Sequence, residues 1–252
     1  MIEIKDLNIS FDGKKVIDGV NLSVTEGDTL VMLGKNGSGK SVILKTIAGL
    51  INEYSGSIFI NGADITEFFH DRGTGKKQSL DDFRLAYVFQ KGGLFDSMTV
   101  FDNVAFGLRR MGVEEQKIEE LVLNTLQRVG LKGNEYKVPV ELSGGMQKRV
   151  GLARAVCLNP NIILYDDPTA GLDPILSDSI ADLILEIEQS FNTTSIVVTQ
   201  DLKVARKISR NIALLYGGKI VYTAKGDDFF MKKDSYAKQF IEGEMEGPID
   251  IF

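Results

Sequence analysis

Hydrophobic and polar positions change their spacing several times along this chain, and each spacing predicts a different element. Residues 2–10 alternate polar and apolar, as expected of a half-buried strand, and FDGKK then supplies a turn into the run VIDGVNLSV. Later segments carry continuous apolar runs, which are typical of strands buried in a sheet. These segments are TLVML, NIILYD, TSIVVTQ and NIALLYGGKIVYTA.

Helical spacing appears in three places. The first is the segment SVILKTIAGL, whose helical spacing ends at Gly49. The second covers almost all of about 97–156, and the third is one continuous helical pattern over about 174–191. Two short strands are expected around the turn at Asn61 and Gly62, and the segment RLAYVFQ is predicted to be a strand that ends at Gln90. This order predicts a nucleotide-type α/β core interrupted by an all-helical insertion.

The segment at 66–82 is polar and punctuated by glycines, so it predicts a surface loop in which the sole histidine, His70, is solvated. The formal net charge of −6 over 252 residues argues against nucleic acid as the main partner. No stretch reaches the roughly 18 apolar residues of a membrane span, and no signal peptide is visible, so a membrane role is expected to come through a partner. The lone Cys157 is expected to be a small buried hydrophobe in a reducing compartment.

The segment GKNGSGKS fits the pattern G-x-x-x-x-G-K-[ST] between a predicted strand and a predicted helix. Its glycines allow several main-chain N–H groups to turn inward, and the helix start adds positive charge, so the loop can hold phosphate oxygens. Lys40 is expected against the β- and γ-phosphates of ATP and the Ser41 hydroxyl on Mg²⁺. A glycine-rich turn that matches by chance is the alternative. The candidate nucleotide-binding residues are Gly34, Lys35, Asn36, Gly37, Ser38, Gly39, Lys40 and Ser41.

The segment IILYDDPTAGLDP places two acidic residues at the end of a predicted strand. Asp166 is expected to hold Mg²⁺, and Asp167 to face the γ-phosphate and the attacking water as a base or positioning group. The alternative is an acidic turn that starts a helix before Pro168. A phosphate loop in the same chain makes the nucleotide interpretation the stronger one.

The segment ELSGGMQKR opens a predicted helix with Ser143, Gly144 and Gly145, which offer N–H groups and a hydroxyl to an anion. It resembles the signature of ABC-type ATPases, and other segments match that family in order. Phe11 stands where an aromatic residue stacks on adenine, and Gln90 where a glutamine reaches Mg²⁺ and water. AGLD, ending in Asp173, corresponds to the loop that crosses to the second subunit.

The resemblance covers the chain to about residue 225 and implies an α/β fold. That fold is an ABC-type P-loop NTPase core, with a RecA-like mixed sheet and an antiparallel β subdomain, plus an α-helical subdomain. It implies one ATPase domain over 1–225, with its core in 1–94 and 157–225 and its helical subdomain in about 95–156. The pattern of the tail, 226–252, predicts a helical segment at its start.

The family implies a mechanism as well. ATP is held head-to-tail between one subunit's phosphate loop and the other's signature, so a second copy of this chain is the expected partner. The implied catalytic residues are Asp167, Gln90 and Gln200, and the implied metal ligands are Ser41, Gln90 and Asp166. Phe11, the phosphate loop, Ser143, Gly144, Gly145 and Asp173 are the implied nucleotide contacts.

Two positions depart from the family pattern. Gln200 follows the strand TSIVVT where the family has a histidine, and a glutamine amide can donate a hydrogen bond but cannot take up a proton. Asp167 stands where the family has glutamate, and its side chain is shorter by roughly 1.3 Å. A misplacement of about 1 Å can cost on the order of a hundredfold in rate, so tight ATP binding with slow hydrolysis is expected.

Two classes of function remain open: an energy-coupling enzyme that drives a transmembrane permease, and an ATP-gated regulatory module without sustained turnover. Two segments resemble ATPases of Mla-type phospholipid transporters, which serve MCE-domain proteins. They are FQKGGLFDSMTVFDNVAFGLRR and the tail QFIEGEMEGPIDIF. Amino-acid importers are the alternative. The resemblance places the chain on the cytoplasmic face of the inner membrane through its permease. Three phenylalanines are candidates for lining the groove that accepts the permease: Phe95, Phe101 and Phe106. The alternative is that they pack within the helical insertion.

Overall fold

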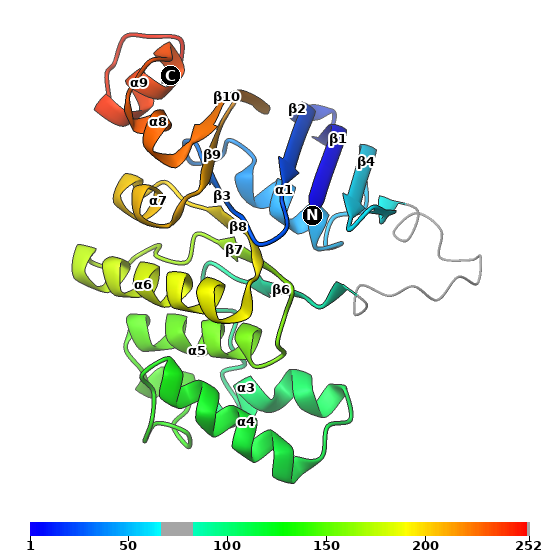
Figure 1. The fold of residues 1–252 in the computed structure, drawn as a ribbon, viewed down its shortest axis with the longest axis vertical. Helices are drawn as coiled ribbons and strands as arrows, with labels where there is room; N and C mark the ends of the chain where they lie inside the picture. The colour runs from blue at the N-terminus through cyan, green and yellow to red at the C-terminus, as the bar shows by residue number, and fades with distance from the viewer. Residues whose placement is uncertain (67–82, 251–252) are drawn as a thin grey trace. The chain divides into compact units, whose positions relative to one another are not determined.

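The structure is a computed structural model that describes residues 1–66 and 83–250 (Figure 1). The chain divides into two compact units, one made of Met1–Phe83 with Thr194–Phe252 and the other of Arg84–Thr193. Of the loop predicted at 66–82, all but Thr66 lies outside the described residues, and so does His70.

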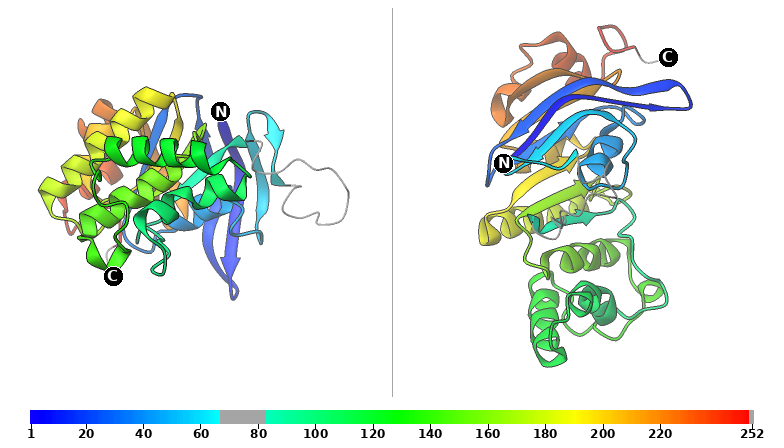
Figure 2. Two further views of the ribbon diagram at one scale, coloured as in Figure 1. Left: turned by 90° about the horizontal axis from the view of Figure 1, so that it is seen from below. Right: turned by 90° about the vertical axis from the view of Figure 1, so that its right-hand side faces the viewer.

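The first unit begins with an antiparallel four-stranded sheet in the order β2-β1-β4-β5. The turn between β1 and β2 consists of Asp12 and Gly13, both at positive φ (49° and 75°), which is the two-residue hairpin turn that matches the strand twist. The predicted hairpin is therefore confirmed, and Figure 2 shows its long blue ribbon. The strands are β1 (Ile2–Phe11), β2 (Lys14–Val24), β4 (Ser55–Ile60) and β5 (Ala63–Asp64).

Four further strands of this unit lie in the order β10-β9-β3-β8, with β3 parallel to both β8 and β9. All five residues of β3 (Thr29–Leu33) and all five of β8 (Thr194–Val198) are buried, as their continuous apolar runs predict. The remaining two strands, β9 (Asn211–Tyr216) and β10 (Lys219–Lys225), form an antiparallel hairpin.

In the described part of the first unit the helices are α1 (Lys40–Ile47), α7 (Leu202–Ile208), α8 (Gly226–Phe230) and α9 (Ser235–Glu242). Helix α7 has only seven residues, too few for a recognisable period, and the sequence pattern did not predict it. Asp201 caps it by accepting hydrogen bonds from Lys203 N and Val204 N. The short helices α8 and α9 follow β10 into the tail (Figure 1).

The second unit contains the parallel pair β6 (Leu85–Val88) and β7 (Ile162–Asp166). Strand β6 ends two residues before Gln90, so the strand predicted to end at Gln90 is too long. Helices α3 to α5 gather together in green (Figure 2), and α4 turns Ile118, Val122 and Leu126 inward at every fourth residue. The helices are α3 (Val100–Arg110), α4 (Glu115–Arg128), the 3₁₀ turn η2 (Pro139–Glu141), α5 (Gly144–Val156) and α6 (Pro174–Phe191).

The boundaries of the compact units differ from the segments expected from the sequence. The second unit includes β6, β7 and α6 in addition to the helices of about 95–156. The division into a core, a helical subdomain and a tail therefore stays a prediction.

Cys157 is 7% exposed, and burial raises the pKa of its thiol, which suits a packing residue better than a nucleophile. The expectation of a small buried hydrophobe is confirmed. In the described parts of the chain, no helix combines the length and apolar character needed to cross a bilayer.

Candidate functional site

The phosphate loop runs from the end of β3 to the start of α1, where only glycine fits at two positions. A Cβ at Gly34 would lie 2.4 Å from Leu215 O, and one at Gly39 would lie 2.6 Å from Ile17 Cδ1. Gly39 also has φ of 103°, which L side chains rarely adopt. These glycines let the main chain curl tightly before the helix begins.

The loop's polar side chains turn inward. Lys40 is 8% exposed, and its Nζ donates hydrogen bonds to Gly34 O (2.7 Å) and Lys35 O (2.9 Å), which hold the ammonium inside the loop. Ser38 Oγ is buried and has no hydrogen-bond partner among the described residues. A buried donor with no partner costs free energy unless a ligand satisfies it. The residues present therefore fit an anionic group such as a phosphate.

The side chain of Lys35 contacts the C-terminal tail of its own chain. Its Nζ donates to Asp250 O (2.9 Å) and lies 5.7 Å from the centre of the Tyr216 ring. Gln239 of α9 holds the same tail, because its amide accepts from Ile249 N (2.6 Å) and donates to Ile249 O (2.9 Å). The tail is thus fixed beside the phosphate loop by hydrogen bonds that the sequence did not indicate.

Two more predicted residues lie in the first unit. Strand β8 runs parallel to β3, and Thr199 N donates to Met32 O (3.2 Å), so Gln200 lies at the same sheet edge as the phosphate loop. Gln200 is exposed. Phe11 ends β1 and is 41% exposed, as expected of an aromatic side chain offered to a ligand.

The acidic pair lies in the second unit, at the end of β7. Asp166 is 5% exposed and accepts a hydrogen bond from the Tyr87 hydroxyl (2.8 Å). Burial, with the nearby charge of Asp166, raises the pKa of Tyr87 above its usual range and keeps it a donor. Asp167 has φ of 44°, and Gln90 Nε2 lies 3.5 Å from its Oδ2. The parallel strands β6 and β7 therefore bring Gln90, Asp166 and Asp167 together.

The signature begins α5 as predicted. Ser143 is the N-cap, and its Oγ accepts from Met146 N (3.3 Å). A Cβ at Gly144 would meet nothing within 4 Å, so the main chain there is open to a ligand. Gly145 is buried against Leu176.

Asp173 has a role within its own chain: it caps α6 by accepting from Ile175 N (2.9 Å) and Leu176 N (3.0 Å). The crossing role that the resemblance implies for it stays a prediction.

Two polar residues near the acidic pair, Tyr87 and Lys148, are not evident from the sequence. Tyr87 alternates with the buried residues of β6, but its place near Asp166 depends on the pairing of β6 with β7, which the strand period does not give. Lys148 donates to the carbonyl of Gln90. Nothing in the sequence marks it, because the contact joins residues 58 positions apart.

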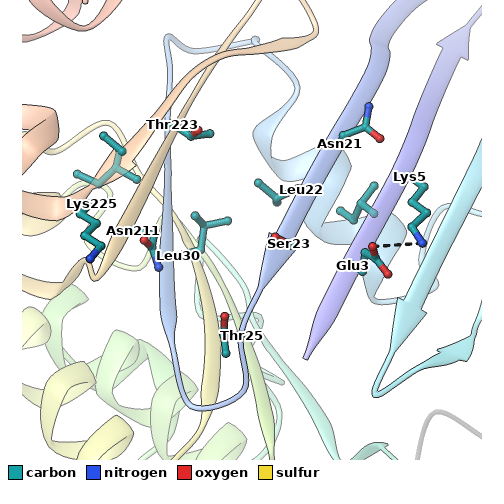
Figure 3. Close-up of a pocket in the computed structure, with 13 residues that line it drawn as sticks. Glu3, Lys5, Asn21, Leu22, Ser23, Thr25, Leu30, Asn211, Thr223 and Lys225 are labelled. Atoms are coloured by element: carbon teal, nitrogen blue, oxygen red, sulfur yellow. Dashed lines mark ion pairs between the residues drawn. The ribbon is translucent and has the colours of Figure 1, made fainter. Parts of the chain in front are cut away.

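A polar cleft of about 810 Å³ lies elsewhere in the first unit (Figure 3). It is lined by residues of β1, β2, β3, β9 and β10 and by Thr25, with the ion pair of Glu3 and Lys5 (3.2 Å) on one side. None of the predicted site residues lines it.

A second, mainly apolar groove of about 500 Å³ lies in the second unit. Phe95 and Phe106 line it with their ring centres 4.8 Å apart, and Phe89 joins them. Arg154 lies 5.7 Å from the Phe95 ring. Phe101 instead lies under Arg109 at 5.9 Å, so two of the three phenylalanines singled out in the sequence belong to the groove.

The sequence profile described as ABC transporter matches residues 17–170, which is more than half of the chain. The chain belongs to the ABC transporter family. This ABC ATPase is 38% identical to the probable ribonucleotide transport ATP-binding protein mkl of Mycobacterium leprae, over 99% of this chain and 71% of that protein. It is 34% identical to the intermembrane phospholipid transport system ATP-binding protein MlaF of Haemophilus influenzae, over 99% of this chain and 93% of that protein.

It is also 36% identical to the methionine import ATP-binding protein MetN of Carboxydothermus hydrogenoformans, over 92% and 68% of the two chains. Among solved structures, cbiO1 from Clostridium perfringens superposes with a TM-score of 0.81 at 27% identity, covering 95% of this chain and 94% of that chain. That protein is part of the ABC transporter complex cbiONQ. The ATP-binding cassette MJ0796, a dimer bound to ADP and Pi in a post-hydrolysis state, superposes with a TM-score of 0.79 at 28% identity. The superposition covers 89% of this chain and 98% of that chain.

These likenesses confirm the expected fold of an ABC cassette. The chain is an ATP-binding P-loop hydrolase that powers a transporter.

Proposed function

We propose that this ABC ATPase powers the movement of phospholipids through a membrane transporter. The supporting observation is the match to MlaF, which extends over 99% of this chain and 93% of that protein. The match to the methionine importer leaves about 8% of this chain out. An amino-acid importer remains the second candidate, and the name of mkl adds ribonucleotides as a third substrate class.

The proposed nucleotide contacts follow the geometry of the loop. The phosphate loop, Gly34 to Ser41, holds the phosphates of ATP with its N–H groups and with Lys40, and Phe11 stacks on the adenine ring. Ser143, Gly144, Gly145 and Asp173 are proposed to serve the nucleotide of a second copy of the chain. The self-complementary arrangement is a twofold dimer.

Hydrolysis is assigned to Asp167, Gln90 and Gln200. The proposed Mg²⁺ ligands, Ser41, Gln90 and Asp166, supply hydroxyl, amide and carboxylate oxygens, which suit this hard cation. When bound, Mg²⁺ would neutralise charge on the phosphates. Asp167 would orient the attacking water and accept its proton, and Gln200 would donate a hydrogen bond to the γ-phosphate.

The proposed partners are a multi-spanning permease and, if the substrate is a phospholipid, an MCE-domain protein. The groove of Phe95 and Phe106 has the apolar lining that an amphipathic helix of a permease would fill. Docking there would hold the chain on the cytoplasmic face of the inner membrane.

A tagged copy of the chain is expected to co-purify from its native membranes with a multi-spanning protein that stimulates phosphate release. Phe106→Asp, which places a charge in the apolar groove, is expected to lower the captured amount at least about tenfold, since an unpaired buried charge costs more than the roughly 1.4 kcal/mol of a tenfold change. Leu123→Asp is the matched control, because Leu123 of α4 is similarly exposed (39% against 37%) but does not line the groove. Equal capture by both variants would contradict docking at this groove.

The captured complex then distinguishes the substrate classes. Reconstituted in vesicles, it is expected to move fluorescent phospholipids in an ATP-dependent manner, and methionine and a ribonucleotide serve as the competing cargoes. A complex that carries only one of those two overturns the lipid assignment. A chain that dimerises with ATP yet captures no membrane protein points instead to the regulatory module.

Removal of residues 244–252 is expected to weaken assembly of the dimer or of the complex, as the resemblance of the tail implies. Light scattering with MgATP over a range of concentrations measures the dimer. Truncation also leaves the buried Gln239 amide without Ile249, at a cost of about 1–3 kcal/mol in the free energy of unfolding. Lys232→Ala is the control, because it removes an ion pair with Glu242 of α9 (2.7 Å) and leaves residues 244–252 and the phosphate loop in place. A truncated chain that is folded and assembles normally contradicts the prediction.

A further inference from the structure

The loop that carries Gln90 is fastened to the helix that begins at the signature. Helix α5 starts directly after Ser143, and Lys148 lies in its second turn. Lys148 Nζ donates a hydrogen bond to the main-chain carbonyl of Gln90. Lys148 lies within the segment ELSGGMQKR, but the sequence and the family pattern assign no role to it.

The next two turns of α5 hold the rest of the same loop. A Cβ at Gly151 would lie 3.2 Å from Gly92 O, so the loop's main chain packs directly on the helix. Arg154 then donates to Gly93 O (2.7 Å) and to Gly92 O (3.1 Å). Residues three apart on a helix are neighbours on its surface, so one strip of α5 holds the main chain from Gln90 to Gly93.

Fixing the main chain of this loop fixes the direction of one side chain. Gln90 is exposed, yet its Nε2 lies 3.5 Å from Asp167 Oδ2. Lys148 is partly buried, and burial lowers the pKa of its ammonium while the charges of Asp167 and Asp166 oppose that shift. The ammonium therefore lies close enough to the acidic pair to be stabilised by it.

We propose that Lys148 is a positioning residue for ATP hydrolysis, which holds the Gln90 carbonyl and so directs the Gln90 amide toward Asp167. The inference rests on the proposed roles of Gln90 and Asp167 in the hydrolytic site. Because α5 also begins at the signature, one rigid helix then links the residues proposed to meet the partner's nucleotide with the hydrolytic loop of this chain.

Steady-state ATPase assays of the full chain test the proposal. Lys148→Met keeps the length of the side chain and removes its donor, and it is expected to lower kcat roughly tenfold while the KM for MgATP stays within about twofold, as misplacement of a catalytic group predicts. Lys148→Arg still offers a donor and is expected to retain at least about half of kcat. Lys148→Leu, which also lacks a donor, replaces the methionine variant if thermal melting shows that the latter does not fold.

A double-mutant cycle shows whether Lys148 acts through Gln90. Gln90→Ala is expected to lower kcat by itself, and Lys148→Met is expected to add no further loss in that background. Losses that multiply, or a raised KM with unchanged kcat, overturn the proposal. A loss in Gln90→Ala without one in Lys148→Met overturns the positioning role alone, whereas an unchanged Gln90→Ala overturns the proposed role of Gln90.

Lys91→Met is the matched control for charge. Lys91 is exposed and adjacent to Gln90 in the chain, so its replacement removes the same charge from the same loop. It is expected to leave kcat within about twofold of the unaltered chain. A loss equal to that of Lys148→Met would show that net charge, and not the contact with the Gln90 carbonyl, is responsible.

Discussion

Lys40→Ala is expected to weaken binding of MgATP at least about a hundredfold and to abolish measurable turnover. The ammonium is held inside the phosphate loop by the carbonyls of Gly34 and Lys35, and is therefore oriented before any nucleotide arrives. One hydrogen bond from the ammonium to a charged phosphate oxygen contributes about 1.5–3 kcal/mol, to which the attraction between the ammonium and the phosphate charges adds. At about 1.4 kcal/mol for each tenfold change, the loss exceeds a hundredfold.

Titration with a fluorescent ATP analogue and calorimetry would measure this loss. Lys45→Ala is the control, because Lys45 lies in the last turn of the same helix and its alanine variant removes the same charge. It is expected to bind MgATP within about threefold of the unaltered chain. Binding by Lys40→Ala that falls within the same threefold would contradict the assignment of the phosphate loop.

Restoring the family residues at the two departures is expected to raise turnover. We expect Asp167→Glu with Gln200→His to hydrolyse ATP about tenfold to a hundredfold faster than the unaltered chain, with MgATP affinity changed by no more than a few-fold. The longer carboxylate recovers roughly 1.3 Å of reach, and displacement of about 1 Å accounts for a hundredfold in rate. The histidine restores a side chain that can become charged beside the γ-phosphate.

The measurement is phosphate release by the assembled complex for both single variants and the double variant. Asp167→Asn is the matched control, since it keeps the size of the side chain, removes its charge and is expected to lower turnover at least about tenfold. If neither single change nor the double change raises the rate, the two departures do not limit hydrolysis.

The main chain at Asp167 adds a cost that the sequence did not show. Its φ of 44° lies in the left-handed region, where aspartate and asparagine are tolerated better than longer side chains. Asp167→Glu is therefore expected to lower the free energy of unfolding by up to about 1 kcal/mol. A faster but slightly less stable enzyme is the combined expectation.

Most of the fold was predictable because its signals are local. The continuous apolar runs of β3 and β8 require burial on both faces, and Asp12-Gly13 is a turn by its own backbone preferences. The phosphate loop was predictable for the same reason, since its glycines, Lys40 and Ser41 occur within eight consecutive residues. Helix α7 was missed because seven residues show too little of a helical period.

The sequence by itself determined the family, the phosphate loop, the signature and the two departures at Asp167 and Gln200, because each is a matter of residue type at a short spacing. Only the tertiary structure placed Tyr87 on Asp166, Lys148 on the Gln90 carbonyl and Lys35 on the tail. Those contacts join residues 58 or more positions apart, so their partners are chosen by how the elements pack and leave no periodic trace in the chain.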